Sequence, residues 1–216
     1  MIERPPPDVK RTRPYDASRR REQARQNRVR IIDAAEQLFL RDGYSATTVQ
    51  AIAAAAGVSP DTVYKSFGGK PGLIRAIRDR ALQGEGPIPA ERRSDAIQEQ
   101  TSDPRTIITA WGAFVAELAP RGSPILLLIR DVAASDPQVR ALRDELDNDR
   151  LKRMTTNARR LRDAGHLRPG ISLAHAADIL WTYSSPELYE LLVLRRGWTP
   201  ERYGRYVADA MINALL

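Results

Sequence analysis

The sequence predicts an all-α protein with a small three-helix head followed by a larger helical bundle. Apolar residues recur at i, i+3, i+4 and i+7 along most of the chain, and no stretch alternates apolar and polar residues as a strand would. Gly and Pro divide the 216 residues into helix-sized segments. We assign residues 1–18 to a disordered basic arm, residues 19–80 to the head and residues 81–216 to the body.

The first helix of the head is predicted to end at Asp42, because Gly43 suits the C′ position after a helix. Upstream of it the apolar residues repeat at helical spacing, so one face of this helix should pack against the rest of the head. These residues are Ile31, Ile32, Ala35, Leu38 and Phe39.

The next segment carries the pattern of a helix-turn-helix. Thr47 can cap a helix, with Gln50 completing a capping box, and the apolar run from Val49 to Ala56 forms the helix itself. Gly57 then supplies the positive φ of a sharp turn, and Ala53 is small enough for a close helix crossing.

The second helix of the pair has a strong start. Ser59 suits the N-cap, Pro60 the first helical position and Asp61 the first turn. Val63 and Phe67, four residues apart, should face the core. An ordinary helical hairpin in an all-α protein is the alternative, because it would show the same caps. We expect instead that this second helix enters a DNA major groove, which makes DNA the leading partner.

With this segment and the residues around it, the chain resembles the TetR (AcrR-type) transcriptional regulators. From about Arg28 to Leu73 it follows the pattern AAExLFxxxGYxxTTVxxIAxxAGVSxxTVYxxFxxKxxL, and near the C-terminus SPELY and RGWTPERY look like the end of many members. Ser66 departs from the family, where His or Tyr is usual, and Gly68-Gly69 stands where a polar cap is usual.

Two kinds of DNA contact are expected from this segment. Thr47 and Thr48 should offer hydroxyls and free N–H groups to a phosphate, and the resemblance implies backbone contacts by Ser59, Tyr64 and Lys70. Base edges should be reached from the start and outer face of the second helix, with Lys65 suited to guanine and Asp61 to a cytosine amino group. The residues expected at base edges are Pro60, Asp61, Thr62 and Lys65.

All of the net charge of +7 lies in the first 80 residues, which hold 16 basic and 9 acidic side chains, whereas the remainder holds 18 of each. Such a patch raises affinity for a polyanion by counterion release. A solvated charged face is the alternative, especially for the arm from Lys10 to Arg30, which could also lie along phosphates or enter a minor groove.

The body is predicted to break into helices at five places. These are Gly84 to Pro87, Asp103-Pro104, Pro120 to Pro124, Asp136-Pro137 and Gly165 to Gly170. The acidic stretch from Asp144 to Asp149 is interpreted as the solvated face of a helix.

The resemblance implies a small-molecule site inside the body, whose occupation favours a head separation that no longer fits DNA. Apolar and aromatic residues of the body are candidates for its wall, with His175 or Asp178 for a polar contact, although a Trp or Phe on an apolar stripe more often belongs to a packed core. The candidates are Trp111, Phe114, Leu118, Ile129, His175, Trp181 and Tyr183.

The last two helical regions carry more apolar residues than one chain usually covers. The resemblance implies that they pack against a second copy as a four-helix interface, so that a homodimer binds a palindromic operator. The alternative is that both regions close the core of a monomer. The apolar residues include Ile179, Leu180, Leu188, Leu191, Leu194, Tyr203, Tyr206, Val207 and Met211.

The sequence therefore predicts a DNA-binding transcriptional regulator, expected to be a cytoplasmic repressor released by a small-molecule effector. Cys is absent and only His166 and His175 are His, so no thiolate or His-rich metal site, cofactor or catalytic residue is predicted. No nucleophile elbow, P-loop or HExxH motif supports an enzyme, and no signal peptide or membrane span is expected. A non-specific architectural DNA-binding protein and a regulator without an effector stay open as alternatives.

Overall fold

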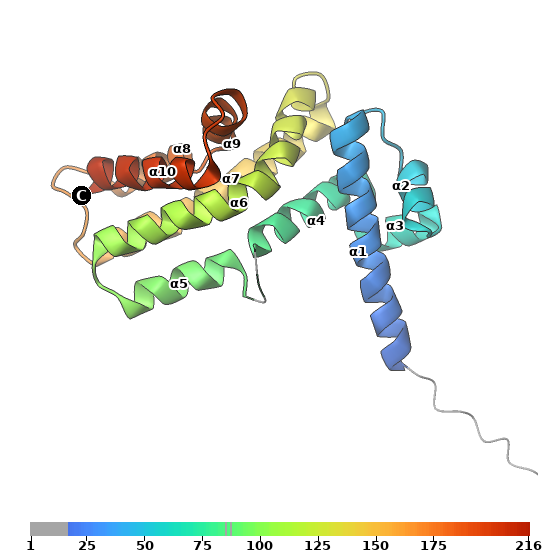
Figure 1. Ribbon diagram of the computed structural model, residues 1–216, viewed down its shortest axis with the longest axis horizontal. Coiled ribbons are helices and arrows are strands. Elements are labelled where there is room, and N and C mark those ends of the chain that lie inside the picture. Colours follow the sequence, from blue (N-terminus) through green and yellow to red (C-terminus); the bar gives the residue numbers. More distant parts are fainter. Residues whose placement is uncertain (1–16, 85, 87) are drawn as a thin grey trace, which may run out of the picture.

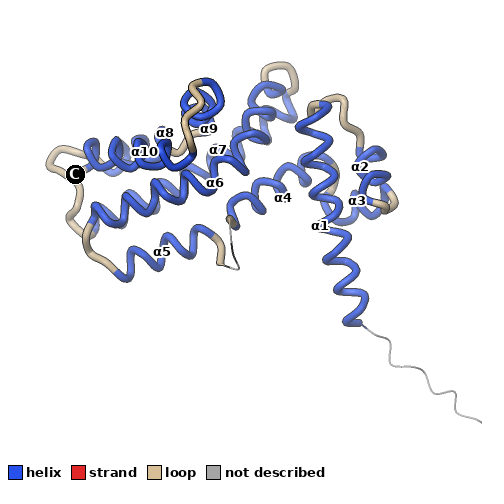
Figure 2. Tube along the Cα trace, viewed as in Figure 1, coloured by secondary structure: helices blue, strands red, loops and turns tan. Residues whose placement is uncertain are grey.

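The computed structural model describes residues 17–84, 86 and 88–216. Within these residues every regular element is a helix, which confirms the predicted all-α class (Figure 2). In chain order the elements are α1 (Ala17–Asp42), α2 (Val49–Ala56), α3 (Pro60–Phe67), α4 (Lys70–Gln83), α5 (Ala90–Gln100), α6 (Pro104–Ala133), α7 (Pro137–Asp163), α8 (Leu173–Tyr183), α9 (Pro186–Tyr189), the π-helical segment η1 (Glu190–Arg195) and α10 (Pro200–Leu215).

The helices form a head and a body connected by α4, as Figure 1 shows. We call α1, α2 and α3 the head, and α5 to α10 with η1 the body. In the body, α6 packs against both α7 and α10, while α5 lies along α6 (Figure 1). The predicted arrangement of a three-helix head and a helical bundle is therefore confirmed.

The head does not have a core of its own. Its buried side chains, such as Phe39 and Ile52, belong to one apolar cluster with residues from the end of α6 and the start of α7, among them Ile129 and Leu142. A second cluster, around Trp111 and Tyr203, fills the other end of the body. The head therefore shares its packed side chains with α4, α6 and α7.

The predicted break between Pro120 and Pro124 is wrong, because α6 runs without interruption over 30 residues. A proline inside a helix removes one N–H donor and crowds the preceding turn. Here the apolar faces on both sides of the prolines are buried, with Ile108 and Ile129 almost fully covered. Tertiary packing therefore keeps the helix together through its prolines.

The other predicted breaks at Asp103-Pro104, Asp136-Pro137 and Gly165 to Gly170 coincide with helix ends. Asp103 and Asp136 each cap the following helix, and each accepts two backbone N–H groups of its first turn. Of the described helices, α6 alone is long and apolar enough to cross a bilayer, a criterion that the core helix of a globular protein also meets.

Candidate DNA interface and ligand cavity

The turn between α2 and α3 has the geometry that the sequence predicts. Gly57 adopts a left-handed conformation with φ of 65°, and its N–H reaches back to the last turn of α2. Ser59 caps α3 by accepting the N–H of Thr62, and Pro60 occupies the first helical position. Ala53 is only 1% exposed, and its small side chain allows α3 to pack close to α2.

Helix α3 presents its polar face to solvent. Val63 is fully buried, whereas Tyr64 is 50% exposed and Lys65 is also exposed. Ser59, Pro60 and Asp61 are exposed at its start, and Thr62 is partly covered by its contact with Ser59. The side chains expected at base edges thus share an accessible helix end and face, and their contacts with bases stay predictions.

The predicted capping box of α2 is wrong by one residue. Thr48 is the N-cap, and its hydroxyl oxygen accepts the N–H of Ala51 at 3.1 Å. The Thr47 side chain is only 3% exposed, and its hydroxyl lies within hydrogen-bond distance of the carbonyl oxygens of Leu38 and Gly43. Its hydroxyl therefore belongs to the loop after α1, which leaves Thr48 as the residue of the pair that faces solvent.

Lys70 has an internal role that the sequence did not indicate. Its Nζ donates to the carbonyl oxygens of Tyr44, at 2.7 Å, and Thr47, at 3.0 Å, and lies 4.3 Å from the centre of the Tyr44 ring. Burial lowers the pKa of this ammonium group. Lys70 therefore fastens the loop between α1 and α2 to the start of α4, with one N–H left for a phosphate.

The glycine pair before Lys70, a departure from the family pattern, forms the turn from α3 into α4. Gly68 has φ of 71° and Gly69 has φ of 115°, both in the range that other residues rarely adopt. No side chain caps α4. The polar cap that is usual in the family is thus replaced by two residues that permit a tight turn.

The first part of helix α1 extends past α2 and α3 and is rich in arginine (Figure 1). Arg20, Arg21, Arg25 and Arg30 are exposed on this extension, and Arg25 is paired with Glu22 at 2.8 Å. The helix begins at Ala17, so the end of the predicted disordered arm at residue 18 lies inside it, and residues 1–16 lie outside the described part of the chain.

Comparison with known proteins decides what this head is. The family model described as bacterial regulatory proteins, tetR family, matches residues 31–77, from α1 to α4. Over this region the chain is similar to the TetR family. The matching region contains the whole helix-turn-helix, so the chain shares this unit with bacterial regulatory proteins of that family.

Two curated relatives show how far the similarity extends. YvkB of Bacillus subtilis, an uncharacterized HTH-type transcriptional regulator, is 37% identical over 70 residues, which cover 32% of this chain and 37% of YvkB. The HTH-type transcriptional regulator UidR of Escherichia coli is 28% identical over 166 residues, covering 73% of this chain and 78% of UidR. The first match thus spans little more than a third of its relative, and the second includes much of the body.

Solved structures agree in overall fold. The native NalD structure from Pseudomonas aeruginosa, a secondary repressor of the MexAB-OprM multidrug efflux pump, superposes with a TM-score of 0.68 at 20% identity and covers 90% of this chain and 98% of NalD. The SmeT–triclosan complex has a TM-score of 0.64 at 24% identity, covering 88% of this chain and 91% of SmeT. The similarity therefore includes head and body together.

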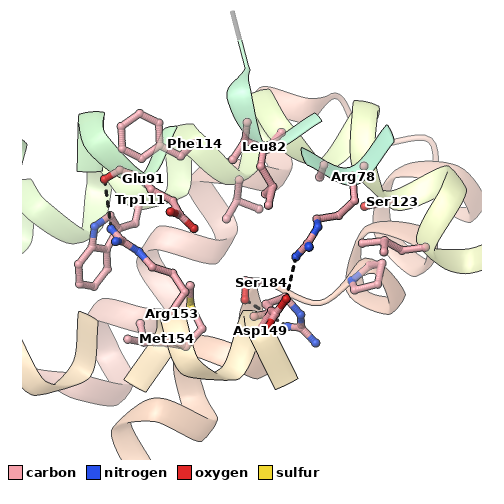
Figure 3. A pocket seen from close by; sticks show the side chains of 18 of the residues that line it. Arg78, Leu82, Glu91, Trp111, Phe114, Ser123, Asp149, Arg153, Met154 and Ser184 are labelled. Carbon is pink, nitrogen blue, oxygen red and sulfur yellow. Dashed lines mark hydrogen bonds and ion pairs between the residues drawn. The ribbon is translucent and has the colours of Figure 1, made fainter. Parts of the chain in front are cut away.

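The body contains a cavity of about 250 Å³, lined by residues of α4 to α9 and α10. Figure 3 shows Trp111 and Phe114 toward one end of it and Arg78 with Asp149 toward the other. Three of the predicted wall residues, Trp111, Phe114 and Leu118, line the cavity. Trp111 Nε1 donates to Ser94 Oγ at 2.9 Å, which fixes the indole ring.

Four other candidates do not line this cavity. Ile129 is buried in the cluster shared with the head, and His175 is exposed on α8. Trp181 and Tyr183 are partly buried on α8, and the Trp181 ring lies under the guanidinium of Arg150 at 4.5 Å. Helical periodicity finds which residues are covered, but it does not distinguish a cavity wall from a packed core.

The charged part of the cavity wall was missed. Asp147 and Asp149, which we expected on a solvated face, are 43% and 40% exposed but also line the cavity together with three arginines. Spacings of three and four along α7 relate each of these carboxylates to an arginine, Asp147 to Arg150 and Asp149 to Arg153. The charged residues that line it are Arg78, Glu91, Asp147, Asp149, Arg150 and Arg153.

Helix α4 connects the cavity to the head. Lys70 at its start holds the loop of the head, whereas Arg78 near its end lines the cavity and pairs with Asp149 of α7 at 3.4 Å. Arg75 is paired with Glu145 of α7 at 2.5 Å, and the Arg75 guanidinium lowers the pKa of that carboxyl. Arg80 pairs with Asp33 and Glu36 of α1. Helix α4 therefore contacts both the body and the head.

Among the described residues, no three His, Cys, Asp or Glu side chains are grouped as metal ligands would be.

Proposed function

We propose that this protein is a homodimeric repressor of the TetR family that binds a palindromic operator and is released when a small molecule occupies the cavity of the body. The observation that carries the proposal is α4, whose Lys70 fastens the head and whose Arg78 lines the cavity. A ligand that changes the position of Arg78 would move a helix on which the head is packed.

The DNA part of the proposal rests on the exposed face of α3. Lys65 and Asp61 are placed to contact base edges, and Thr48, Ser59 and Tyr64 are placed to contact phosphates. The basic extension of α1 adds positive charge beside the head and would strengthen binding to any duplex. A protein with this function works beside the chromosome, in the cytoplasm.

The effector part rests on an internal cavity of mixed character. Apolar walls with a few polar groups are typical of small-molecule sites, and about 250 Å³ suits a compact ligand. SmeT, which shares the fold, is known as a triclosan complex, and NalD is described as a repressor. These likenesses support a ligand-responsive repressor in preference to a regulator without an effector.

The dimer part rests on apolar side chains that one chain leaves uncovered. Tyr203, Val207 and Met211 of α10, which we expected at an interface, are buried within the chain itself. Leu191 and Leu194 of η1 are 50% and 54% exposed, and Tyr206 of α10 is 42% exposed. A second copy packing on η1 and the outer face of α10 would cover them.

Capture of genomic fragments tests the operator. The purified protein is incubated with fragments of the source genome and competitor DNA in about 150 mM salt, where charge-driven binding is weak, and the retained fragments are sequenced. Enrichment of a few sites with an inverted repeat supports the dimeric regulator. Uniform recovery of fragments supports the non-specific architectural protein instead.

Sedimentation velocity tests the dimer separately. Leu194→Glu places a charge on the proposed interface, and Ile88→Glu is the matched control, because Ile88 is also 54% exposed but lies outside α8 to α10. A dimer that dissociates only in the Leu194 variant supports the proposal. A monomeric wild-type protein at micromolar concentration contradicts it.

A further inference from the structure

One face of α7 lines the cavity with chemically different side chains at its two ends. Arg150, Met154 and Asn157 all line it and follow one another at i, i+4 and i+7, so they share a face of the helix. Two turns separate Arg150 from Asn157, which is about 10 Å along the helix axis. A ligand lying along this face would meet a guanidinium at one end, a thioether in the middle and an amide at the other end.

The Arg150 guanidinium is mostly buried, and three of the contacts that hold it in place are with uncharged groups. It donates to the carbonyl oxygen of Trp181 and to Ser184 Oγ, the latter at 3.3 Å, and it lies 4.5 Å from the centre of the Trp181 ring. These contacts fix its position. They do not neutralise its charge.

The carboxylate nearest to Arg150 compensates this charge incompletely. The closest oxygen of Asp147 is 3.4 Å away, and the Asp147 side chain is 43% exposed, whereas that of Arg150 is 17% exposed. Burial lowers the pKa of Arg150, an effect that the charge of Asp147 only partly opposes. A mostly buried cation whose one paired carboxylate is long, at 3.4 Å, and partly hydrated favours an additional anion.

The other charges of the cavity do not alter this conclusion. Arg153 already has a carboxylate at 2.8 Å, that of Asp95, and Arg78 has Asp79 at 2.9 Å and Asp149 at 3.4 Å. Glu91 is exposed and Asp149 is 40% exposed, so these carboxylates lie toward solvent. Arg150 is thus the cavity cation with the least direct compensation.

Asn157 provides a second polar position. The residue is 4% exposed, and its Oδ1 has no hydrogen-bond partner among the described residues. A buried amide oxygen without a donor is unfavourable, so a donor from a ligand would stabilise the complex. The apolar side chains of Trp111, Phe114, Met154 and Leu180 line the same cavity.

We propose that the effector is a compact amphipathic acid whose carboxylate pairs with Arg150 and whose hydroxyl or N–H donor, about 10 Å away, binds Asn157 Oδ1. The apolar part between them, a ring or short chain, packs on Met154. This inference rests on the proposed function of the cavity as an effector site, and it adds the chemical class of the effector.

Matched probes test this class by isothermal titration calorimetry on the full-length protein. The probes are 4-hydroxyphenylalkanoic acids with two to five chain carbons, each with its methyl ester, its primary amine analogue and its analogue without the phenolic hydroxyl. We expect at least one acid to bind, its ester and amine to bind about tenfold or more weakly, and loss of the phenol to weaken binding several-fold.

Variants assign the two ends of the ligand. Arg150→Met should abolish the preference for acid over ester. Arg143→Met is the control and should preserve this preference, because Arg143 also lies on α7 but pairs with Asp144 and does not line the cavity. Asn157→Leu should remove the advantage of the phenol without changing the preference for the acid. Thermal unfolding verifies that each variant is folded, and the comparison among probes on the wild-type protein does not depend on any variant.

Two results overturn the inference: no acid of the series binds, or esters and amines bind as tightly as acids. Operator binding is measured in the same samples by fluorescence anisotropy. An acid that binds through Arg150 but leaves the operator complex intact contradicts the proposed effector-released repressor and not the ligand class. Release of the operator by neutral or cationic molecules alone contradicts the ligand class and not the repressor.

Discussion

Gly112 of α6 and Gly204 of α10 face each other where the two helices cross. A β-carbon on Gly204 would lie 2.5 Å from the carbonyl oxygen of Gly112 and 2.7 Å from Cβ of Ala116, and one on Gly112 would lie 2.7 Å from Cβ of Ala208. Neither glycine has a positive φ. Close approach of two backbones, and not an unusual conformation, therefore requires glycine at both positions.

Substituting either glycine should destabilise the body. In an open helix, Gly→Ala stabilises by about 1 kcal/mol, but overpacking a close crossing costs about 1 to 3 kcal/mol. We expect Gly204→Ala to lower the free energy of unfolding, as measured by urea denaturation. The matched control is Gly122→Ala in α6, where the nearest atom to a new β-carbon is Cβ of Ala81 at 3.6 Å. Equal stability of the two variants would contradict this account.

Lys70→Met should loosen the head. The substitution removes two charge-assisted hydrogen bonds to carbonyl oxygens and the contact with the Tyr44 ring. Each such bond contributes about 1.5 kcal/mol or more, so we expect a clear loss in the free energy of unfolding and weaker binding to all duplexes alike. An unchanged unfolding curve with weaker DNA binding would instead identify Lys70 as a phosphate contact only.

Lys65→Ala should change sequence preference and leave stability intact. The side chain is exposed on α3, so its loss removes no internal contact, whereas a base contact contributes about 1 to 3 kcal/mol of discrimination. Selection of operators from a random library, compared with the wild-type protein, measures the effect. If the selected sequences are the same, Lys65 has no part in base recognition.

Glu145→Gln should weaken the attachment of α4 to α7 in a pH-dependent way. Arg75 lowers the pKa of Glu145 in the folded protein below its ordinary value of 4.5, so this pair stabilises the fold above that pH and the stabilisation is lost as the pH falls through the lowered pKa. Both side chains are about 40% exposed, so the effect should be small, about 0.2 to 1 kcal/mol.

Urea denaturation at pH 7 and at pH 3 compares Glu145→Gln with the wild-type protein. The difference should be present at pH 7 and smaller at pH 3, because the wild-type carboxyl takes up a proton as the pH falls toward its lowered pKa. A difference that is the same at both pH values would mean that the charge of Glu145 is not what stabilises the pair.

The sequence by itself determined the elements that depend on neighbouring residues. The cap at Ser59, the turn at Gly57 and the breaks at Asp103-Pro104 and Asp136-Pro137 were predicted, because a capping side chain, a residue that permits a positive φ, or a proline acts within a few positions. The sequence pattern of the head also consists mostly of such caps, turns and neighbouring apolar residues.

Only the tertiary structure decided the features that depend on distant residues. The helix continues through Pro120 because packing on both sides outweighs local preference, and Gly112 needs no side chain because Gly204, far away in the chain, lies against it. Likewise, Asp147 and Arg150 line a cavity because α4, α6 and α8 surround that face of α7. Hydrophobic spacing determines that a face is covered, whereas what covers it, and whether a space remains, depends on how the helices pack.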